Sequence, residues 1–125
     1  MSGRPRVLVV EDESLVAMML CDMLEDLGCA VVGPTATVTG ALALLDAGAP
    51  PDGALLDVNL GGESAYGVAD ALARRAVPFI FVSGYGRGGI DPRYAQAPVL
   101  SKPFEPVRLA RAVGQALRSM TEARP

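Results

Sequence analysis

Short apolar runs alternate with longer amphipathic segments along almost the whole chain. Five of the apolar runs contain few polar residues, as expected of strands that are covered on both faces of a parallel sheet. These five predicted strands comprise residues 6–10, 29–32, 53–57, 77–82 and 98–100. Glycine, proline or acidic residues follow most of the runs, which places turns or loops at their ends.

Between the strands, apolar residues recur at spacings of three and four, which is the period of an amphipathic helix. We expect helices over residues 14–27, 66–75 and 106–120, and one that is capped by Thr37 or Thr39 and ends before residue 48. The side chains expected to face the core are Val16, Met19, Leu20, Met23, Leu24, Leu27, Ala41, Leu42, Leu44, Leu45, Val68, Ala69, Leu72, Ala73, Leu109, Val113, Ala116, Leu117 and Met120.

The segment before the last predicted strand breaks this alternation. Residues 87–92 include glycine and proline residues, which disfavour a helix. We therefore expect a loop there, or at most one short irregular turn over residues 92–95, in place of a regular fourth helix.

Strands that alternate with helices predict an α/β domain, with a parallel sheet, helices on both faces and right-handed crossovers. The chain has 125 residues, of which 50% are hydrophobic. This length suits one domain over residues 1–125, with a core from about residue 5 to residue 120.

Composition excludes several classes of function. The net charge of -3 argues against a nucleic-acid partner. No apolar run reaches the ~18 residues of a membrane span, and residues 1–5 lack the apolar core of a signal peptide. We therefore expect a cytoplasmic protein without a membrane partner. Histidine is absent, which excludes histidine-ligated metals, a Ser-His-Asp triad and an internal phosphohistidine. Cys21 and Cys29 lack metal-site spacing and are expected to be reduced thiols.

Candidate chemistry lies where the strands end. Glu11 and Asp12 follow the first predicted strand, Asp57 ends the third, and Lys102 follows the fifth. The carboxyl ends of parallel strands meet at one edge of a sheet, so these side chains are expected in one pocket. Clustered carboxylates favour a hard cation such as Mg²⁺. We expect Asp12 and Asp57 as direct ligands, Glu11 as a ligand through water, and the backbone carbonyl of Asn59 as a further ligand.

A carboxylate beside a bound cation can accept a phosphoryl group and form an aspartyl phosphate, and Asp57 is the candidate. Such a transfer needs positioning and positive charge more than acid–base groups. Lys102 would supply the charge, and the hydroxyl of Ser83 could donate to a phosphoryl oxygen. Gly84 would leave room beside the phosphate.

Taken together, Glu11-Asp12, Asp57, Ser83 and Lys102-Pro103-Phe104 resemble the receiver domain of two-component response regulators, over nearly the whole chain. The resemblance implies a flavodoxin-like fold with strand order 2-1-3-4-5 and a cis bond between Lys102 and Pro103. It also implies that Asp57 takes a phosphoryl group from a sensor histidine kinase or a histidine phosphotransfer protein, with Mg²⁺ bound. Such a chain is not an enzyme, and it signals through an unidentified protein partner or a phosphorelay.

One position departs from the family pattern. The aromatic switch residue usual three positions before the lysine is replaced here by Val99. Residues 78–86 instead resemble the Pro-Phe-x-Phe-Ala-Thr-Gly-Tyr (FAT GUY) motif of an alphaproteobacterial receiver subgroup that is often single-domain and linked to stress signalling. Val82 and Ser83 differ from the Ala and Thr of that motif. Tyr85 is the candidate for a moving aromatic residue.

Two other functions are considered. A haloacid-dehalogenase-type phosphatase shares the aspartate, Mg²⁺, hydroxyl and lysine, but it needs an acid two residues after the nucleophile, where this chain has Asn59. A flavin or nucleotide carrier would place backbone donors after the first strand, whereas residues 11–13 are acidic and would repel phosphate.

Overall fold

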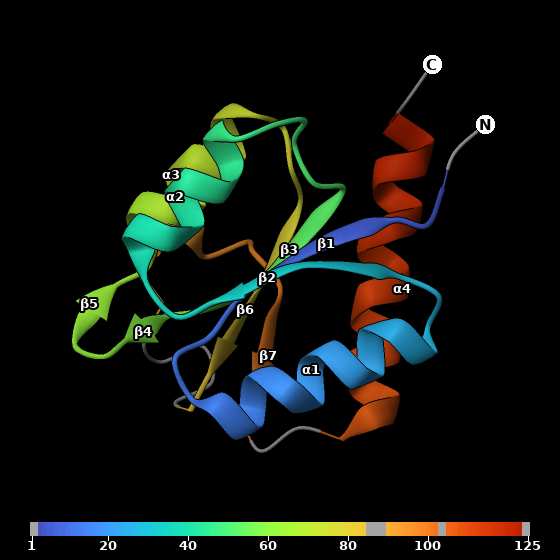
Figure 1. Cartoon of the computed structure of the whole chain (residues 1–125), viewed down its shortest axis with the longest axis horizontal. Coiled ribbons are helices and arrows are strands. Elements are labelled where there is room, and N and C mark those ends of the chain that lie inside the picture. Colours follow the sequence, from blue (N-terminus) through green and yellow to red (C-terminus); the bar gives the residue numbers. More distant parts are fainter. Residues whose placement is uncertain (1–2, 85–89, 103–104, 124–125) are drawn as a thin grey trace.

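A computed structural model describes residues 3–84, 90–102 and 105–123, without the side chains of residues 106 and 116–123. Five parallel strands form one sheet in the order β2-β1-β3-β6-β7 (Figure 1). The sheet strands are β1 (Arg6–Val10), β2 (Ala30–Thr35), β3 (Gly53–Asp57), β6 (Phe79–Ser83) and β7 (Val99–Ser101). The helices are α1 (Ser14–Asp26), α2 (Val38–Asp46), α3 (Tyr66–Arg74) and α4 (Pro106–Ala123). Because β6 and β7 are the fourth and fifth sheet strands, the order is 2-1-3-4-5, and the predicted flavodoxin-like fold is confirmed.

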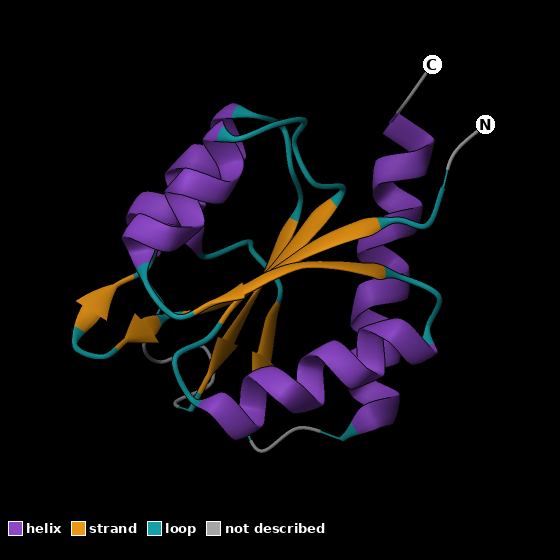
Figure 2. Ribbon diagram, viewed as in Figure 1, coloured by secondary structure: helices purple, strands orange, loops and turns teal. Residues whose placement is uncertain are grey.

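Helices cover both faces of the sheet, with α2 and α3 on one face and α1 and α4 on the other (Figure 2). Side chains alternate along β1: Leu8 packs with α2 and α3, whereas Val7 and Val9 pack with α1 and α4. All residues of β3 are buried. This burial explains why the central strands are apolar throughout, and it makes the carboxylate at the end of β3 exceptional.

The buried faces of two helices are narrower than their apolar residues predict. In α1 the buried residues are Ala17, Leu20 and Leu24, whereas Met19 is 46% exposed. Leu27, just beyond the helix, is also exposed, and in α3 the buried position is Ala71 rather than the predicted Ala73. Those three predictions were wrong, because apolar residues at neighbouring helical positions cannot all face one sheet. The predicted core positions Ala116, Leu117 and Met120 lie outside the side chains that the structure describes.

Thr37 caps α2, since its hydroxyl accepts a hydrogen bond of 2.9 Å from the backbone N of Gly40. Strand β2 begins one residue after the predicted Cys29 and continues through Gly33 and Pro34 to Thr35. The prediction that it ends at residue 32 was wrong. Proline is tolerated here because β2 is an edge strand, and the pairing with β1 shifts register beside it.

After β3, where the sequence indicates only a turn or loop, the chain forms a small antiparallel hairpin of β4 (Asn59–Leu60) and β5 (Glu63–Ser64). Gly61 and Gly62 form its turn with φ angles of 60° and 90°. Two adjacent residues with positive φ match the twist of an antiparallel pair, and glycine adopts such angles without strain.

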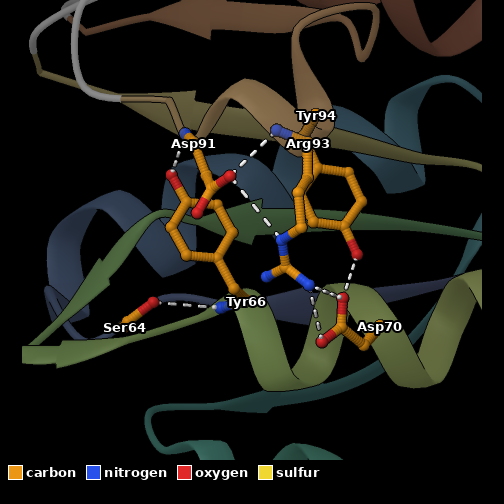
Figure 3. A network of polar contacts seen from close by, with 6 residues as sticks. All are labelled: Ser64, Tyr66, Asp70, Asp91, Arg93 and Tyr94. Carbon is orange, nitrogen blue, oxygen red and sulfur yellow. Dashed lines mark hydrogen bonds and ion pairs between the residues drawn. The ribbon is translucent and has the colours of Figure 1, made fainter.

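The segment before β7 is irregular, as predicted, and contains only the short 3-10 helix η2 (Pro92–Tyr94) among its described residues. Hydrogen bonds attach it to α3 (Figure 3). The hydroxyl of Tyr66 accepts a bond of 2.7 Å from the backbone N of Asp91, and the hydroxyl of Tyr94 donates to the carboxylate of Asp70.

Four aromatic rings pack beneath this attachment. The rings of Tyr66 and Tyr94 are stacked, with centroids 5.8 Å apart. Phe79 and Phe81 meet Tyr94 edge to face, and Phe81 is fully buried. These contacts position a segment that lacks regular helix, since aromatic pairs of this geometry are stabilising beyond the area they bury.

No helix within the described ranges combines the length and the apolar character needed to cross a bilayer.

Candidate functional site

Strand pairing brings the predicted site residues to one edge of the sheet. Val10 pairs with Leu56, one residue before Asp57, and Asp57 pairs with Val82 on β6. Ser83 in turn pairs with Ser101 on β7. Residues that follow these strands therefore start from adjacent positions, although they are distant in sequence.

Backbone hydrogen bonds fix two of the loops that leave these strands. The N–H of Glu11 donates to the carbonyl of Thr35 at 2.9 Å. The N–H of Lys102 donates to the carbonyl of Ser83 at 2.8 Å. These bonds extend the sheet pattern past the ends of β1 and β7, so the first residues beyond each strand are held in place.

Three carboxylates form an acidic cluster at this edge. One oxygen from each of Glu11, Asp12 and Asp57 lies within 4.8 Å of the others. Glu11 and Asp57 are buried, whereas Asp12 is exposed. Three hard oxygen donors, open to solvent on one side, suit a divalent cation that retains several waters. The predicted convergence of these three residues is confirmed.

Lys102 lies against the same cluster. Its Nζ donates to Asp57 Oδ2 at 3.0 Å and to Glu13 Oε1 at 3.1 Å, and it lies 3.1 Å from Glu11 Oε1. The sequence predicted that Lys102 approaches Asp57, but it did not assign Glu13 to the site. The available signal was that Glu13 is the third acid in the run that begins at Glu11.

Burial and neighbouring charge change the acidity of two of these groups. Burial, reinforced by the hydrogen bond with Asp57, raises the pKa of Glu11 from its ordinary 4.5 to about 7, although Glu13 N–H and Lys102 oppose the rise. Burial alone would lower the pKa of Lys102, but its hydrogen bonds to Asp57 and Glu13 and its ion pair with Glu11 outweigh burial and raise that pKa. Lys102 therefore stays charged. The ionised form of Glu11 is disfavoured, and further positive charge close to its carboxylate would stabilise it.

One ligand atom of the cluster has incomplete partners. Glu11 Oε1 is buried and, within the described part of the chain, accepts no hydrogen bond, because the nearby Lys102 Nζ is an ion-pair contact without hydrogen-bond geometry. A buried carboxylate oxygen that accepts no hydrogen bond is costly, and the ion pair with Lys102 offsets only part of that cost. The donor set and this oxygen both fit a hard divalent ion.

Three other predicted site residues follow β3 or lie at the end of β6. The N–H of Asn59 donates to Asp57 Oδ1 at 3.1 Å and orients the carboxylate. Ser83 is buried at the end of β6, and Gly84 is exposed, with open space where a Cβ would point. Tyr85 and the Lys102–Pro103 bond, predicted as a moving aromatic and a cis peptide, lie outside the described residues.

The comparisons agree with this geometry. The family described as "Response regulator receiver domain" matches residues 7–114. The phyllosphere-induced regulator PhyR of Methylorubrum extorquens is 33% identical over 121 residues, which cover 94% of this chain and 45% of PhyR. The chain spans about half the length of the curated relatives it matches.

Solved structures extend the likeness. The solution structure of SdrG from Sphingomonas melonis Fr1 has a TM-score of 0.79 at 46% identity, covering 97% of this chain and 99% of SdrG. The BeF3-activated conformation of SdrG from Pseudomonas melonis Fr1 has a TM-score of 0.78 at 47% identity, covering 94% and 99%.

The matched region contains all of the sheet except Arg6 at the start of β1, together with the acidic cluster and Lys102. The family that matches is a signalling module rather than a catalytic enzyme, which argues against the phosphatase hypothesis. From its fold, its acidic pocket and these matches, the chain belongs to the response regulator receiver domain family.

Proposed function

We propose that Asp57 accepts a phosphoryl group from a phosphohistidine, on a sensor histidine kinase or on a histidine phosphotransfer protein. An oxygen of the Asp57 carboxylate would form a bond to phosphorus as the phosphorus–nitrogen bond of the donor breaks, and the histidine nitrogen would leave with the electron pair. The observation that supports this most directly is the position of the Asp57 carboxylate, beside two further acids and 3.0 Å from Lys102 Nζ.

Mg²⁺ is the proposed cofactor, held by Asp12, Asp57, Glu11 and the backbone carbonyl of Asn59. When bound, it would offset the negative charge of the carboxylates and of the phosphoryl oxygens. The residues of the chain do the rest. Lys102 would pair with one phosphoryl oxygen, which requires only a small displacement of an ammonium that already contacts Asp57.

Ser83 would donate its hydroxyl hydrogen to a second phosphoryl oxygen. Gly84 would allow the group to approach the backbone closely, and Tyr85 would change position when Ser83 engages the phosphate. A downstream protein partner would then bind the changed surface at this edge of the sheet, or the phosphoryl group would be transferred to another protein in a phosphorelay. The BeF3-activated conformation of SdrG supports this proposal, because BeF₃⁻ on a carboxylate mimics a phosphoryl group in charge and shape.

Phosphotransfer from candidate histidine kinases tests the proposal. Wild type is expected to become labelled in the presence of Mg²⁺ and to remain unlabelled when excess EDTA removes the ion. Asp57→Asn is expected to gain none, whereas Asp22→Asn, an equal charge change at an exposed position of α1, is expected to label like wild type. Equal labelling of Asp57→Asn and wild type would show that Asp57 is not the acceptor.

A further inference from the structure

Three carboxylates surround the ammonium group of Lys102, which donates hydrogen bonds to two of them and forms an ion pair with the third. The ammonium has three N–H donors and lies 3.0 Å from Asp57 Oδ2, 3.1 Å from Glu13 Oε1 and 3.1 Å from Glu11 Oε1. A phosphoryl oxygen that binds Lys102 therefore competes with these carboxylates for the ammonium. Which of the three contacts is released depends on how readily each carboxylate can return to water.

Burial separates the three partners clearly. The side chain of Glu11 is 1% exposed and that of Asp57 is 8% exposed, whereas that of Glu13 is 62% exposed. A carboxylate that moves into solvent recovers its hydration, but a buried one would remain unpaired at a high cost. Glu13 is therefore the partner that Lys102 can release most easily.

The position of Glu13 on its helix points to the same role. Glu13 is the N-cap residue of α1, and its carbonyl accepts a bond of 2.9 Å from the N–H of Ala17. Its side chain makes no capping hydrogen bond, although capping is the usual use of a polar side chain at this position. The side chain instead reaches Lys102, 89 positions later in the chain.

We propose that Glu13 is a positioning residue that holds Lys102 in the unphosphorylated state and competes with the phosphoryl group for it. This inference rests on the proposed function of Asp57. The carboxylate of Glu13 would compete with the phosphoryl group for the ammonium. It would hold the ammonium beside the pocket, and it would lower the affinity of the pocket for a phosphoryl oxygen until the contact between Glu13 and Lys102 breaks.

Binding of BeF₃⁻ to the intact protein in saturating Mg²⁺ measures this competition, because bound fluoroberyllate gives its own ¹⁹F NMR signals. A largely exposed ion pair is weak, so its removal is expected to raise BeF₃⁻ affinity by about two- to fivefold in Glu13→Gln. Glu25→Gln is the matched control, with the same change of charge at an exposed position of the same helix, and its affinity is expected to equal that of wild type.

Glu13→Asp separates contact from charge. It retains the charge and improves the helix cap, but it shortens the side chain by one methylene, so it is expected to lose the contact and to bind BeF₃⁻ more tightly than wild type. If Glu13→Asp binds like wild type while only Glu13→Gln changes, net charge explains the effect and the proposal is overturned.

The two proposals fail in different ways. If wild type binds BeF₃⁻ but both Glu13 variants match it, Glu13 does not compete for Lys102, and the function of Asp57 stands. If wild type does not bind BeF₃⁻ in Mg²⁺, the proposed function fails, and the role of Glu13 fails with it. Circular dichroism of each variant confirms that a change in binding occurs in folded protein.

Discussion

Replacing Glu11 with glutamine is expected to make the metal-free protein more stable at alkaline pH. The folded state raises the pKa of Glu11 from 4.5 to about 7, so the folded protein favours the protonated carboxyl. The favourable contribution is complete below pH 4.5 and is lost as the pH rises toward 7. Glutamine resembles the protonated carboxyl at every pH, and it therefore avoids this loss.

The magnitude follows from the same two pKa values. Each pKa unit corresponds to about 1.4 kcal/mol, so the rise from 4.5 to about 7 sets an upper bound of roughly 3 kcal/mol above pH 8. The measured value should lie below this bound, because the charge of Glu11 is shared with that of Asp57 and Lys102 and the cluster is open to solvent on one side. At pH 5 the expected difference between Glu11→Gln and wild type is much smaller.

Urea unfolding in EDTA, followed by far-UV circular dichroism, measures this difference at pH 5 and pH 8. The free energy of unfolding of Glu11→Gln should exceed that of wild type at pH 8, and the gap should narrow when Mg²⁺ is added, since wild type binds the ion more tightly. A difference that does not vary with pH, or a variant that is less stable at pH 8, would refute the reasoning.

Three further predictions concern the residues around the site. Phe81→Ala is expected to lower the free energy of unfolding by about 3–5 kcal/mol, measured in urea, because it empties a fully buried position; a loss below about 1 kcal/mol would contradict this. Gly61→Ala is expected to cost about 1–2 kcal/mol in the same assay, because φ is 60° there, and an unchanged midpoint would argue against the hairpin turn. The pKa of Tyr94 is expected near 12, because burial and the bond to Asp70 favour the neutral phenol, so its stabilising effect is complete below pH 10 and lost toward pH 12. Ultraviolet absorbance of wild type minus that of Tyr94→Phe, recorded as a function of pH, follows the ionisation of Tyr94 and gives this pKa. A value near 10 would be inconsistent with the hydrogen bond.

The sheet and the acidic pocket could be predicted from the sequence. The sheet follows from the spacing of apolar residues, and the pocket follows from the position of the acidic residues and Lys102 at the ends of strands. Apolar runs that are buried on both faces identify strands, and parallel strands end at one edge of the sheet. Asp57 and Lys102 could therefore be placed together, although they are 45 positions apart. The roles of Asn59, Ser83 and Gly84 in phosphoryl transfer stay predictions.

Details that depend on tertiary contacts could not be predicted. The exposure of Met19 depends on how narrow a stripe of α1 faces the sheet, which periodicity alone does not fix. The course of β2 through Pro34 depends on its being an edge strand. The contact of Glu13 with Lys102 and the stacking of Tyr66 on Tyr94 join segments that are distant in sequence, and the local sequence around these residues does not predict them.

Chemical mapping of the phosphoryl group tests the central claim most directly. After treatment with a phosphodonor, borohydride reduces an acyl phosphate to an alcohol and so converts a phosphorylated aspartate to homoserine, which peptide mass spectrometry locates. We expect homoserine at position 57 alone, formed in Mg²⁺ and not in EDTA. Homoserine at another acidic position, or equal conversion without the metal, would contradict the assignment of Asp57 as the metal-dependent acceptor.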